Sequence, residues 1–184
     1  SRCPELGNLK NVRVVNPSQQ GLAAKMPAGN EASFVRDPTW SRISLGSPVE
    51  VHVIVGPQNS GKSTLCKYLL NRLRSDSSQT GGDKKLLYVL DVDCGQPIFN
   101  LPGTVSLLAC DAANNDVLPK MGAINETFLN SANPAVDPEK YLAVVAKKLR
   151  QYQRLPGQKH LIVNTCGWVE GLGAEIQTQI IQLA

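Results

Sequence analysis

The sequence predicts an α/β fold, a three-layer sandwich in which helices cover both faces of a mainly parallel sheet. Strand-sized apolar runs alternate with helical segments along the chain, in the order strand, helix, strand, helix, strand, helix. The strand runs are apolar at almost every position, which is typical of strands that are buried on both faces of a parallel sheet. A chain of 184 residues is long enough to bury one such core.

The first clear strand is expected at 49–55, and a helix at 61–74 should follow it. In that helix segment leucine recurs every four residues, so the leucines lie on one face that can pack on a sheet. Residues 75–83 are polar and contain two glycines, which favours a loop. A second buried strand is expected at 86–91.

A second helix is expected to begin at Asp137 and Pro138. Aspartate is a preferred N-cap residue, and proline is favoured at the first helical position because it has no amide hydrogen to leave unpaired. This helix should run to Arg154, with Tyr141, Leu142, Val145, Leu149 and Tyr152 facing inward. A third strand at 160–164 and a last helix from about Leu172 complete the alternation.

Two segments show little periodicity. Residues 97–126 suggest no regular element, and the polar stretch 114–116 is typical of a surface turn. We interpret 1–45 as an irregular N-terminal arm or the remnant of a preceding domain, with a short strand at 12–15. Residues 46–184 form the predicted core. We expect this core to be a piece of a larger protein, because its last residues are still predicted to be helical.

Composition indicates a globular protein, since 42% of the residues are hydrophobic and 18% are charged. No apolar run approaches the roughly 20 residues that a membrane-spanning helix needs, so no membrane partner is expected. The net charge of +4 is compatible with a polyanionic ligand. The cysteines contain no C-x-x-C pair, so we expect reduced thiols and neither a disulfide framework nor a zinc site. They are Cys3, Cys66, Cys94, Cys110 and Cys166.

Residues 56–63 match G-x-x-x-x-G-K-[ST], the phosphate-binding loop (P-loop), between a buried strand and a helix. Glycine lets the backbone amides approach phosphate oxygens, and the helix that follows directs its positive end at the same charge. Lys62 should reach the β- and γ-phosphates, and Ser63 should hold Mg²⁺. The alternative is a glycine-rich turn with an incidental lysine. The nucleotide-binding residues are predicted to be Gly56, Pro57, Gln58, Asn59, Ser60, Gly61, Lys62, Ser63 and Thr64.

Asp91 ends the predicted strand at 86–91 and Asp93 follows it, and we expect this strand to neighbour the P-loop strand. A carboxylate in that place can orient the magnesium shell of a P-loop site. Alternatively, one or both cap a turn. The chain has no N-K-x-D guanine motif, no glutamate directly after Asp91 or Asp93, and no L-S-G-G-Q sequence. This pattern disfavours GTPases, motor ATPases and transporter ATPases and favours a kinase, in which a carboxylate activates an acceptor hydroxyl.

Three blocks together resemble the polynucleotide 5'-hydroxyl kinase family of RNA processing. That family includes a pre-rRNA-processing kinase of the nucleolus and an mRNA 3'-end-cleavage and tRNA-splicing kinase. The blocks are the P-loop at 56–64, D-x-D-x-G-Q-P at 91–97 and N-T-x-G-W-V at 164–169. The first block is widespread, whereas the other two are specific and stand in the family's order. The Gln96-Pro97 and Pro102-Gly103 pairs are more similar to the nucleolar branch.

The resemblance implies a P-loop NTPase fold, ATP and Mg²⁺ as cofactors, and transfer of the γ-phosphate of ATP to a 5'-hydroxyl. Asp93 falls on the carboxylate that contacts the reacting hydroxyl and the metal shell, so Ser63 and Asp93 are the implied magnesium ligands. Gln96 is implied to lie near the γ-phosphate. The catalytic candidates are Lys62, Asp91, Asp93 and Gln96.

Thr165, Gly167 and Trp168 fall on the family's clasp for the nucleic-acid end, in which the tryptophan stacks on a base. The other interpretation of Trp168 is a core side chain that closes the sheet edge. The chain departs from the family at Ile98, where the nucleolar branch carries an acidic residue, and at Asn130, where the family carries glycine. The family's arginine-bearing lid would lie beyond the last residue, so we expect the core to be truncated before the lid.

The implied partners are an RNA 5'-hydroxyl end, with DNA as an alternative, and proteins of an RNA-processing complex, in a nuclear and specifically nucleolar location. Two other functions stay open: a nucleotide-binding scaffold without catalysis, and a kinase of a small metabolite. Trp40 is a candidate for an adenine contact without a match in the family. A basic run on the helix at 137–154 is interpreted as a solvated face rather than an RNA contact. It consists of Lys147, Lys148, Arg150 and Arg154.

Overall fold

The computed structural model describes residues 12–15, 38–43, 45, 51–79, 86–110, 121–157 and 159–184. A six-stranded sheet in the order β1-β2-β6-β3-β4-β5 forms its centre. The strands are β1 (Val12–Val15), β2 (Val51–Ile54), β3 (Leu86–Asp91), β4 (Thr104–Cys110), β5 (Met121–Phe128) and β6 (Lys159–Asn164). β1, β2, β6 and β3 are mutually parallel, and β4 pairs in antiparallel fashion with both β3 and β5. The prediction of a mainly parallel sheet is confirmed.

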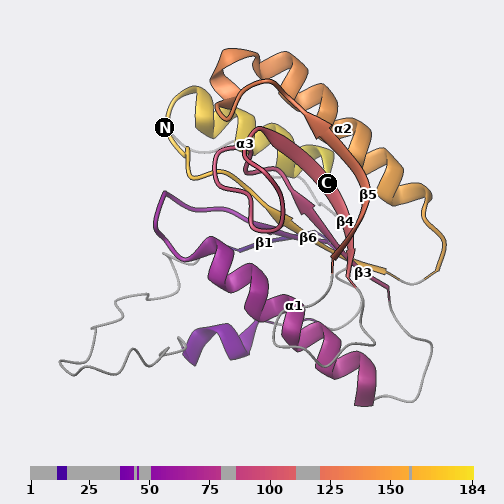
Figure 1. Ribbon diagram of the computed structural model, residues 1–184. Coiled ribbons are helices and arrows are strands. Elements are labelled where there is room, and N and C mark those ends of the chain that lie inside the picture. Colours follow the sequence, from indigo (N-terminus) through magenta and orange to yellow (C-terminus); the bar gives the residue numbers. More distant parts are fainter. Residues whose placement is uncertain are drawn as a thin grey trace.

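Helices cover both faces, as the three-layer prediction requires (Figure 1). α1 (Lys62–Gln79) lies on one face together with the short 3-10 helix η2 (Pro38–Arg42). α2 (Pro138–Arg154) and α3 (Leu172–Leu183) pack side by side on the other face, and the 3-10 helix η3 (Pro134–Val136) precedes α2. No helix within the described ranges combines the length and the apolar character that crossing a membrane requires.

The sheet separates two apolar clusters, one on each face. Neighbouring side chains of a strand point to opposite faces, so one strand contributes to both clusters. In β2, for example, Val51 and Val53 belong to the cluster under α2 and α3, whereas Ile54 packs beneath α1. Leu65 and Leu69 of α1 are fully buried in that second cluster. The leucine spacing therefore identified the buried face of α1 correctly.

The N-terminus of α2 forms as its sequence predicts. The carboxylate of Asp137 accepts a hydrogen bond from the amide of Lys140 at 3.0 Å, and Pro138 occupies the first turn. Tyr141, Val145, Leu149 and Tyr152 are buried, and Leu142 is half-buried. The predicted inward face is confirmed.

Lys148 corrects the prediction of a solvated basic run. Its side chain is buried, and Nζ donates to Oδ1 of Asn125 and, at 2.9 Å, to Oγ1 of Thr127 on β5. Burial lowers the pKa of Lys148 to about 8, and the charge of Lys147 acts in the same direction. One member of the run therefore ties α2 to the sheet, while Lys147, Arg150 and Arg154 are exposed.

Three further expectations about secondary structure were wrong or incomplete. α1 continues to Gln79, through residues that we expected to form a loop. The segment 97–126 contains β4 and most of β5, although it lacks a strand-like pattern. β3 is not adjacent to β2, because β6 is inserted between them. The expected turn at 114–116 lies outside the described residues.

The described parts of 1–45 pack onto the same core. β1 pairs in parallel with β2 from Val12 and Val51 onward. Trp40 is buried beneath α1 with its ring centroid 5.5 Å from that of Tyr68, so the suggested adenine contact is wrong. Arg72 of α1 holds the end of η2 by donating to the carbonyl oxygens of Ser41 at 3.1 Å and Ile43 at 2.8 Å.

Candidate active site

The P-loop connects β2 to α1 at the carboxyl edge of the parallel strands. Gly61 has a φ of 86°, a left-handed conformation that glycine adopts without a steric penalty. Asn59 has a φ of 61°, which asparagine tolerates better than most residues. The amide of Leu65 donates to the carbonyl oxygen of Gly61 at 2.9 Å, so the first helical turn begins directly at the loop. The helix therefore presents its amino end to a ligand in the loop.

Lys62 lies inside this loop with only 7% of its surface exposed. Its Nζ donates to the carbonyl oxygen of Pro57 at 2.9 Å. Burial lowers the pKa of Lys62, whereas the negative charge of Asp93 raises it. Lys62 and Asp93 line the same cavity.

Asp93 follows β3 in a half-buried position, and its carboxylate organises the loop that carries it. Oδ1 accepts hydrogen bonds from the amides of Gly95 at 3.2 Å and Gln96 at 3.0 Å. These bonds fix the side chain while leaving Oδ2 available to a ligand. A Cβ added at Gly95 would lie 3.2 Å from the carbonyl oxygen of Ala132, so the loop after β5 closes against this turn.

Asp91 occupies a different environment from Asp93. Its side chain is 1% exposed, Oδ1 accepts from Nδ2 of Asn164 at 2.9 Å, and Oδ2 accepts from the amide of Ile98 at 2.6 Å. Burial raises its pKa to about 6, although both hydrogen bonds oppose the shift. Asp91 therefore anchors the 93–98 loop from behind, and the structure does not bring it to the cavity as a catalytic group.

The loop after β6 crosses between the P-loop and α3. Thr165 is fully buried, and its hydroxyl donates to the carbonyl oxygen of Ile54 at 2.7 Å. This bond ties the hydroxyl to the last residue of β2, and the clasp role of Thr165 stays a prediction. Gly167 touches the P-loop directly: a Cβ there would lie 2.8 Å from both N and Cα of Gln58.

Trp168 is half-buried and rests on the first turn of α3. A Cβ at Gly173 would lie 2.4 Å from Cγ of the indole, so only glycine leaves room for the ring in this position. Gln177 of α3 donates Nε2 to the carbonyl oxygen of Cys166 at 3.1 Å and also contacts its Sγ at 3.2 Å. The indole partly packs against the apolar cluster under α2 and α3. Trp168 is thus partly packed and partly lines the cavity, and its role as a clasp stays a prediction.

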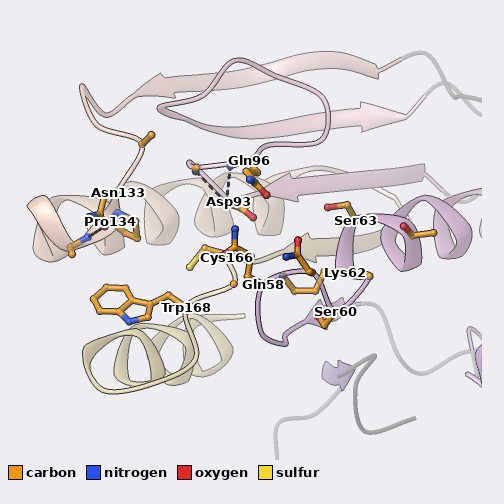
Figure 2. Close-up of a pocket in the computed structure, with 17 residues that line it drawn as sticks. Gln58, Ser60, Lys62, Ser63, Asp93, Gln96, Asn133, Pro134, Cys166 and Trp168 are labelled. Carbon is orange, nitrogen blue, oxygen red and sulfur yellow. Dashed lines mark hydrogen bonds between the residues drawn. The ribbon is translucent and has the colours of Figure 1, made fainter. Parts of the chain in front are cut away.

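These loops surround one cavity of about 820 Å³ (Figure 2). In this view Lys62 and Asp93 face the same opening, with Trp168 at one side and Asn133 and Pro134 above it. The cavity is lined by Gln58, Asn59, Ser60, Gly61, Lys62, Ser63, Thr64, Asp93, Gly95, Gln96, Ala132, Asn133, Pro134, Ala135, Cys166, Gly167 and Trp168. Of the predicted site residues, Gly56, Pro57, Asp91 and Thr165 lie outside this lining.

The wall at 132–135 was not foreseen from the sequence. The side chain of Asn133 caps η3 by accepting from the amide of Ala135 at 2.9 Å, which holds this wall in place. Asn130 precedes the wall with a φ of 62°. Glycine is the residue best suited to that conformation and asparagine is among the best tolerated alternatives, which accounts for the departure from the family pattern. Ile98, the other departure, packs against the apolar cluster beneath α1.

Cys94 and Cys166 are buried near the site. No disulfide joins Cys66, Cys94, Cys110 or Cys166. Burial is the main cause that raises the pKa of Cys94 to about 12 and also raises the pKa of Cys166. Within the described ranges, no three His, Cys, Asp or Glu side chains are grouped as a metal site.

The comparison with known families agrees with this arrangement. The sequence model described as the mRNA cleavage and polyadenylation factor CLP1 P-loop matches residues 56–184, which include the P-loop, the Asp93 turn and the Trp168 loop. The chain belongs to this CLP1 P-loop family. The resemblance seen in the sequence blocks is confirmed.

Several curated relatives carry the name polynucleotide 5'-hydroxyl-kinase GRC3. The protein of Gibberella zeae is 32% identical in an alignment of length 164 that covers 81% of this chain and 23% of the relative. The protein of Emericella nidulans is 35% identical in an alignment of length 150 that covers 71% of this chain and 18% of the relative. The chain thus spans about a fifth of the length of these relatives.

A solved structure supports the fold of this CLP1 P-loop family member. The structure of the wild-type Clp1p-Pcf11p (454–563) complex superimposes with a TM-score of 0.54 and 21% sequence identity. The match covers 73% of this chain and 34% of the solved chain. At this identity the similarity concerns the fold alone.

Proposed function

We propose that this chain is the core of an ATP-dependent polynucleotide 5'-hydroxyl kinase, which transfers the γ-phosphate of ATP to the 5'-hydroxyl of RNA or DNA. The observation that carries the proposal is the shared cavity, which Lys62, Asp93 and Trp168 all line. The names of the curated relatives give the same activity for those proteins.

The P-loop side of the cavity fits a magnesium-bound nucleotide triphosphate. The volume of about 820 Å³ lies in the range of small-molecule sites. Within the described part of the chain, the buried hydroxyl of Ser60 has no hydrogen-bond partner, as expected for a group that awaits a phosphate oxygen. Lys62 would exchange the carbonyl oxygen of Pro57 for the phosphates, Ser63 would hold Mg²⁺, and Asp93 would contact the metal shell. ATP·Mg²⁺ supplies the phosphoryl group and the metal charge that stabilises its transfer.

On the acceptor side, Oδ2 of Asp93 would accept the proton of the incoming 5'-hydroxyl. The two amide hydrogen bonds to Oδ1 prevent rotation of the carboxylate, so Oδ2 is held in one direction. The indole of Trp168, supported by Gly173, offers a flat face on which a nucleobase can stack. Such stacking contributes about 1–3 kcal/mol per base and does not depend on the base sequence.

Transfer of labelled phosphate from ATP to a 5'-hydroxyl oligonucleotide tests this function. We expect the intact protein to be active and Asp93→Asn to lower kcat about 10²–10⁴-fold, the usual contribution of a general base. Lys62→Ala should abolish transfer, because phosphate binding and charge neutralisation are both lost. Glu175→Gln, an exposed carboxylate on α3, serves as the matched control.

The other two functions predict different results. A nucleotide-binding scaffold would bind ATP without any transfer, and cells carrying Asp93→Ala would function normally. A kinase of a small metabolite would tolerate Trp168→Ala, whereas a polynucleotide kinase should lose oligonucleotide affinity with its ATP affinity nearly intact. A folded, ATP-binding protein that phosphorylates no oligonucleotide would refute the proposal.

We also propose that the protein acts in rRNA processing in the nucleolus. The proposal is supported by the Gln96-Pro97 and Pro102-Gly103 pairs, which are more similar to the nucleolar branch of the family. Imaging of the tagged intact protein together with a nucleolar marker tests the location. Unprocessed rRNA precursors are expected to accumulate when the tagged protein carries Lys62→Ala.

A further inference from the structure

The orientation of α2 divides its basic residues into two groups. Tyr141, Val145 and Leu149 face the apolar core, and Lys148 is buried on the same side, where it bonds to β5. The remaining basic side chains are exposed on the side of the helix that points away from the sheet. They are Lys140, Lys147, Arg150 and Arg154, and we call them the basic stripe.

The members of the basic stripe are aligned along the helix. Lys140, Lys147 and Arg154 are separated by seven residues each, which is close to two full turns, and Arg150 lies beside them. At 1.5 Å per residue, the stripe extends for about 21 Å. Glu139 is the single acidic residue of α2. Among the residues that the structure describes, no acidic side chain forms a salt bridge with the stripe.

The stripe begins beside the candidate active site. Lys140 lines a small hollow together with Asn133 and Pro134, and the latter two residues also line the main cavity. In Figure 1 the first turn of α2 lies at the same end of the sheet as the P-loop. A strand that leaves the cavity over the 132–135 wall would therefore meet Lys140 first and the other basic residues in succession.

We propose that the basic stripe binds the phosphodiester backbone of the polynucleotide whose 5' end enters the cavity. This inference rests on the proposed function and assigns the path of the substrate beyond its first nucleotide. Ammonium and guanidinium groups bind phosphate oxygens without reading the bases, so the stripe would increase affinity for long substrates of any sequence. RNA and DNA share this chemistry, and both should use the stripe.

Binding of a 20-nucleotide 5'-hydroxyl RNA with a 3' fluorophore, followed by fluorescence anisotropy from 0.1 to 1 M salt, tests the proposal on the intact protein. The variant is Lys147→Gln/Arg154→Gln. Its matched control is Arg42→Gln/Lys67→Gln, which removes one arginine and one lysine from the opposite face of the sheet. Circular dichroism and the unfolding midpoint establish that each variant is folded.

Two lost phosphate contacts should reduce the slope of log K against log salt by about 1.4, at roughly 0.7 per contact with a single strand. If the variant and the wild type bind equally at 1 M salt, this reduction of the slope corresponds to about 25-fold weaker RNA binding by the variant at 0.1 M salt. The control should keep the wild-type slope. The wild type should also bind the 20-nucleotide RNA more tightly than a 4-nucleotide RNA, and the stripe variant should lose most of that difference.

An unchanged slope and affinity in the folded stripe variant would overturn the proposal. So would a stripe-dependent affinity for polyglutamate with RNA binding unaffected, because the surface would then serve an acidic protein. If the variant weakens RNA binding but the wild type transfers no phosphate, the stripe assignment holds and the proposed catalytic function fails. The two conclusions can therefore be refuted separately.

Discussion

Replacement of Gly167 by alanine tests whether the Trp168 loop and the P-loop are mechanically coupled. The added Cβ would lie 2.8 Å from N and Cα and 3.1 Å from Cβ of Gln58. Two of these atoms are backbone, so the neighbour cannot rotate away as a flexible side chain would. Gly167 is not in the left-handed region, so its own backbone angles permit alanine and the clash is the sole source of strain.

The strain of such overpacking is about 1–3 kcal/mol. It either persists in the free protein, where it lowers the free energy of unfolding, or is relieved by displacement of the P-loop. In the second case a bound nucleotide must restore the loop, which raises the Kd for ATP about 5- to 150-fold at 1.4 kcal/mol per factor of ten. The loss of stability and the loss of ATP-binding free energy should therefore add up to about 1–3 kcal/mol.

Urea unfolding and calorimetric titration with ATP measure the two quantities. Gly122→Ala is the matched control, because Gly122 lies exposed on β5 and a Cβ there meets nothing within 4 Å. We expect the control to retain the wild-type ATP affinity. If Gly167→Ala changes neither the unfolding free energy nor the Kd for ATP, the close contact between the two loops does not exist in solution.

Three further predictions concern stability. Burial lowers the pKa of Lys148 to about 8 from its ordinary value of 10.5. Between these pH values the unfolded state binds more protons than the folded state, so the free energy of unfolding should rise with pH. Urea unfolding at pH 8 and pH 10 should show a smaller rise for Lys148→Met than for the wild type. Burial raises the pKa of Asp91 to about 6 from 3.8. Between pH 4 and pH 6 the folded state therefore binds more protons than the unfolded state, and the free energy of unfolding should fall as the pH rises. Urea titrations of Asp91→Asn should not show this fall. Asp137→Ala should lower the unfolding free energy by about 0.5–2 kcal/mol through loss of the α2 N-cap, measured by the urea midpoint.

Each of these stability predictions has a contrary result. A pH profile of Lys148→Met that parallels the wild type from pH 8 to 10 would show that this lysine is hydrated in the folded protein. The same outcome for Asp91→Asn between pH 4 and 6 would contradict the buried position of the carboxylate. An unchanged midpoint in Asp137→Ala would show that the bond to the Lys140 amide does not contribute to stability.

The sequence predicted those elements whose signals are local. The P-loop, the leucine face of α1, the cap of α2 and the apolar run of β3 each depend on residues close together in the chain. The pair β4 and β5 was missed because β5 is a partly exposed edge strand, in which inward and outward positions do not differ clearly in polarity. Its pairing with β4 becomes apparent only in three dimensions.

The candidate site divides in the same way. The sequence motifs that contain Lys62 and Asp93 predicted that both residues belong to the site, and both line the cavity. The bond of the Thr165 hydroxyl to Ile54 could not be predicted, because Ile54 lies 111 positions earlier and only the pairing of β2 with β6 brings the two residues together. Asp91 and Asp93 were both candidates for the site, but the chain turns after β3, so that Asp91 is buried behind the loop and Asp93 lines the cavity.

The position of β6 between β2 and β3 has a consequence for how the protein acquires its site. The two strands that carry the P-loop and the Asp93 turn do not pair with each other, and each pairs with β6. During synthesis, β2 and β3 therefore leave the ribosome long before the strand that joins them. Contacts of such long sequence separation form late in folding. We expect a nascent chain that ends before residue 159 to bind nucleotide weakly, with high affinity gained only when β6 has been added.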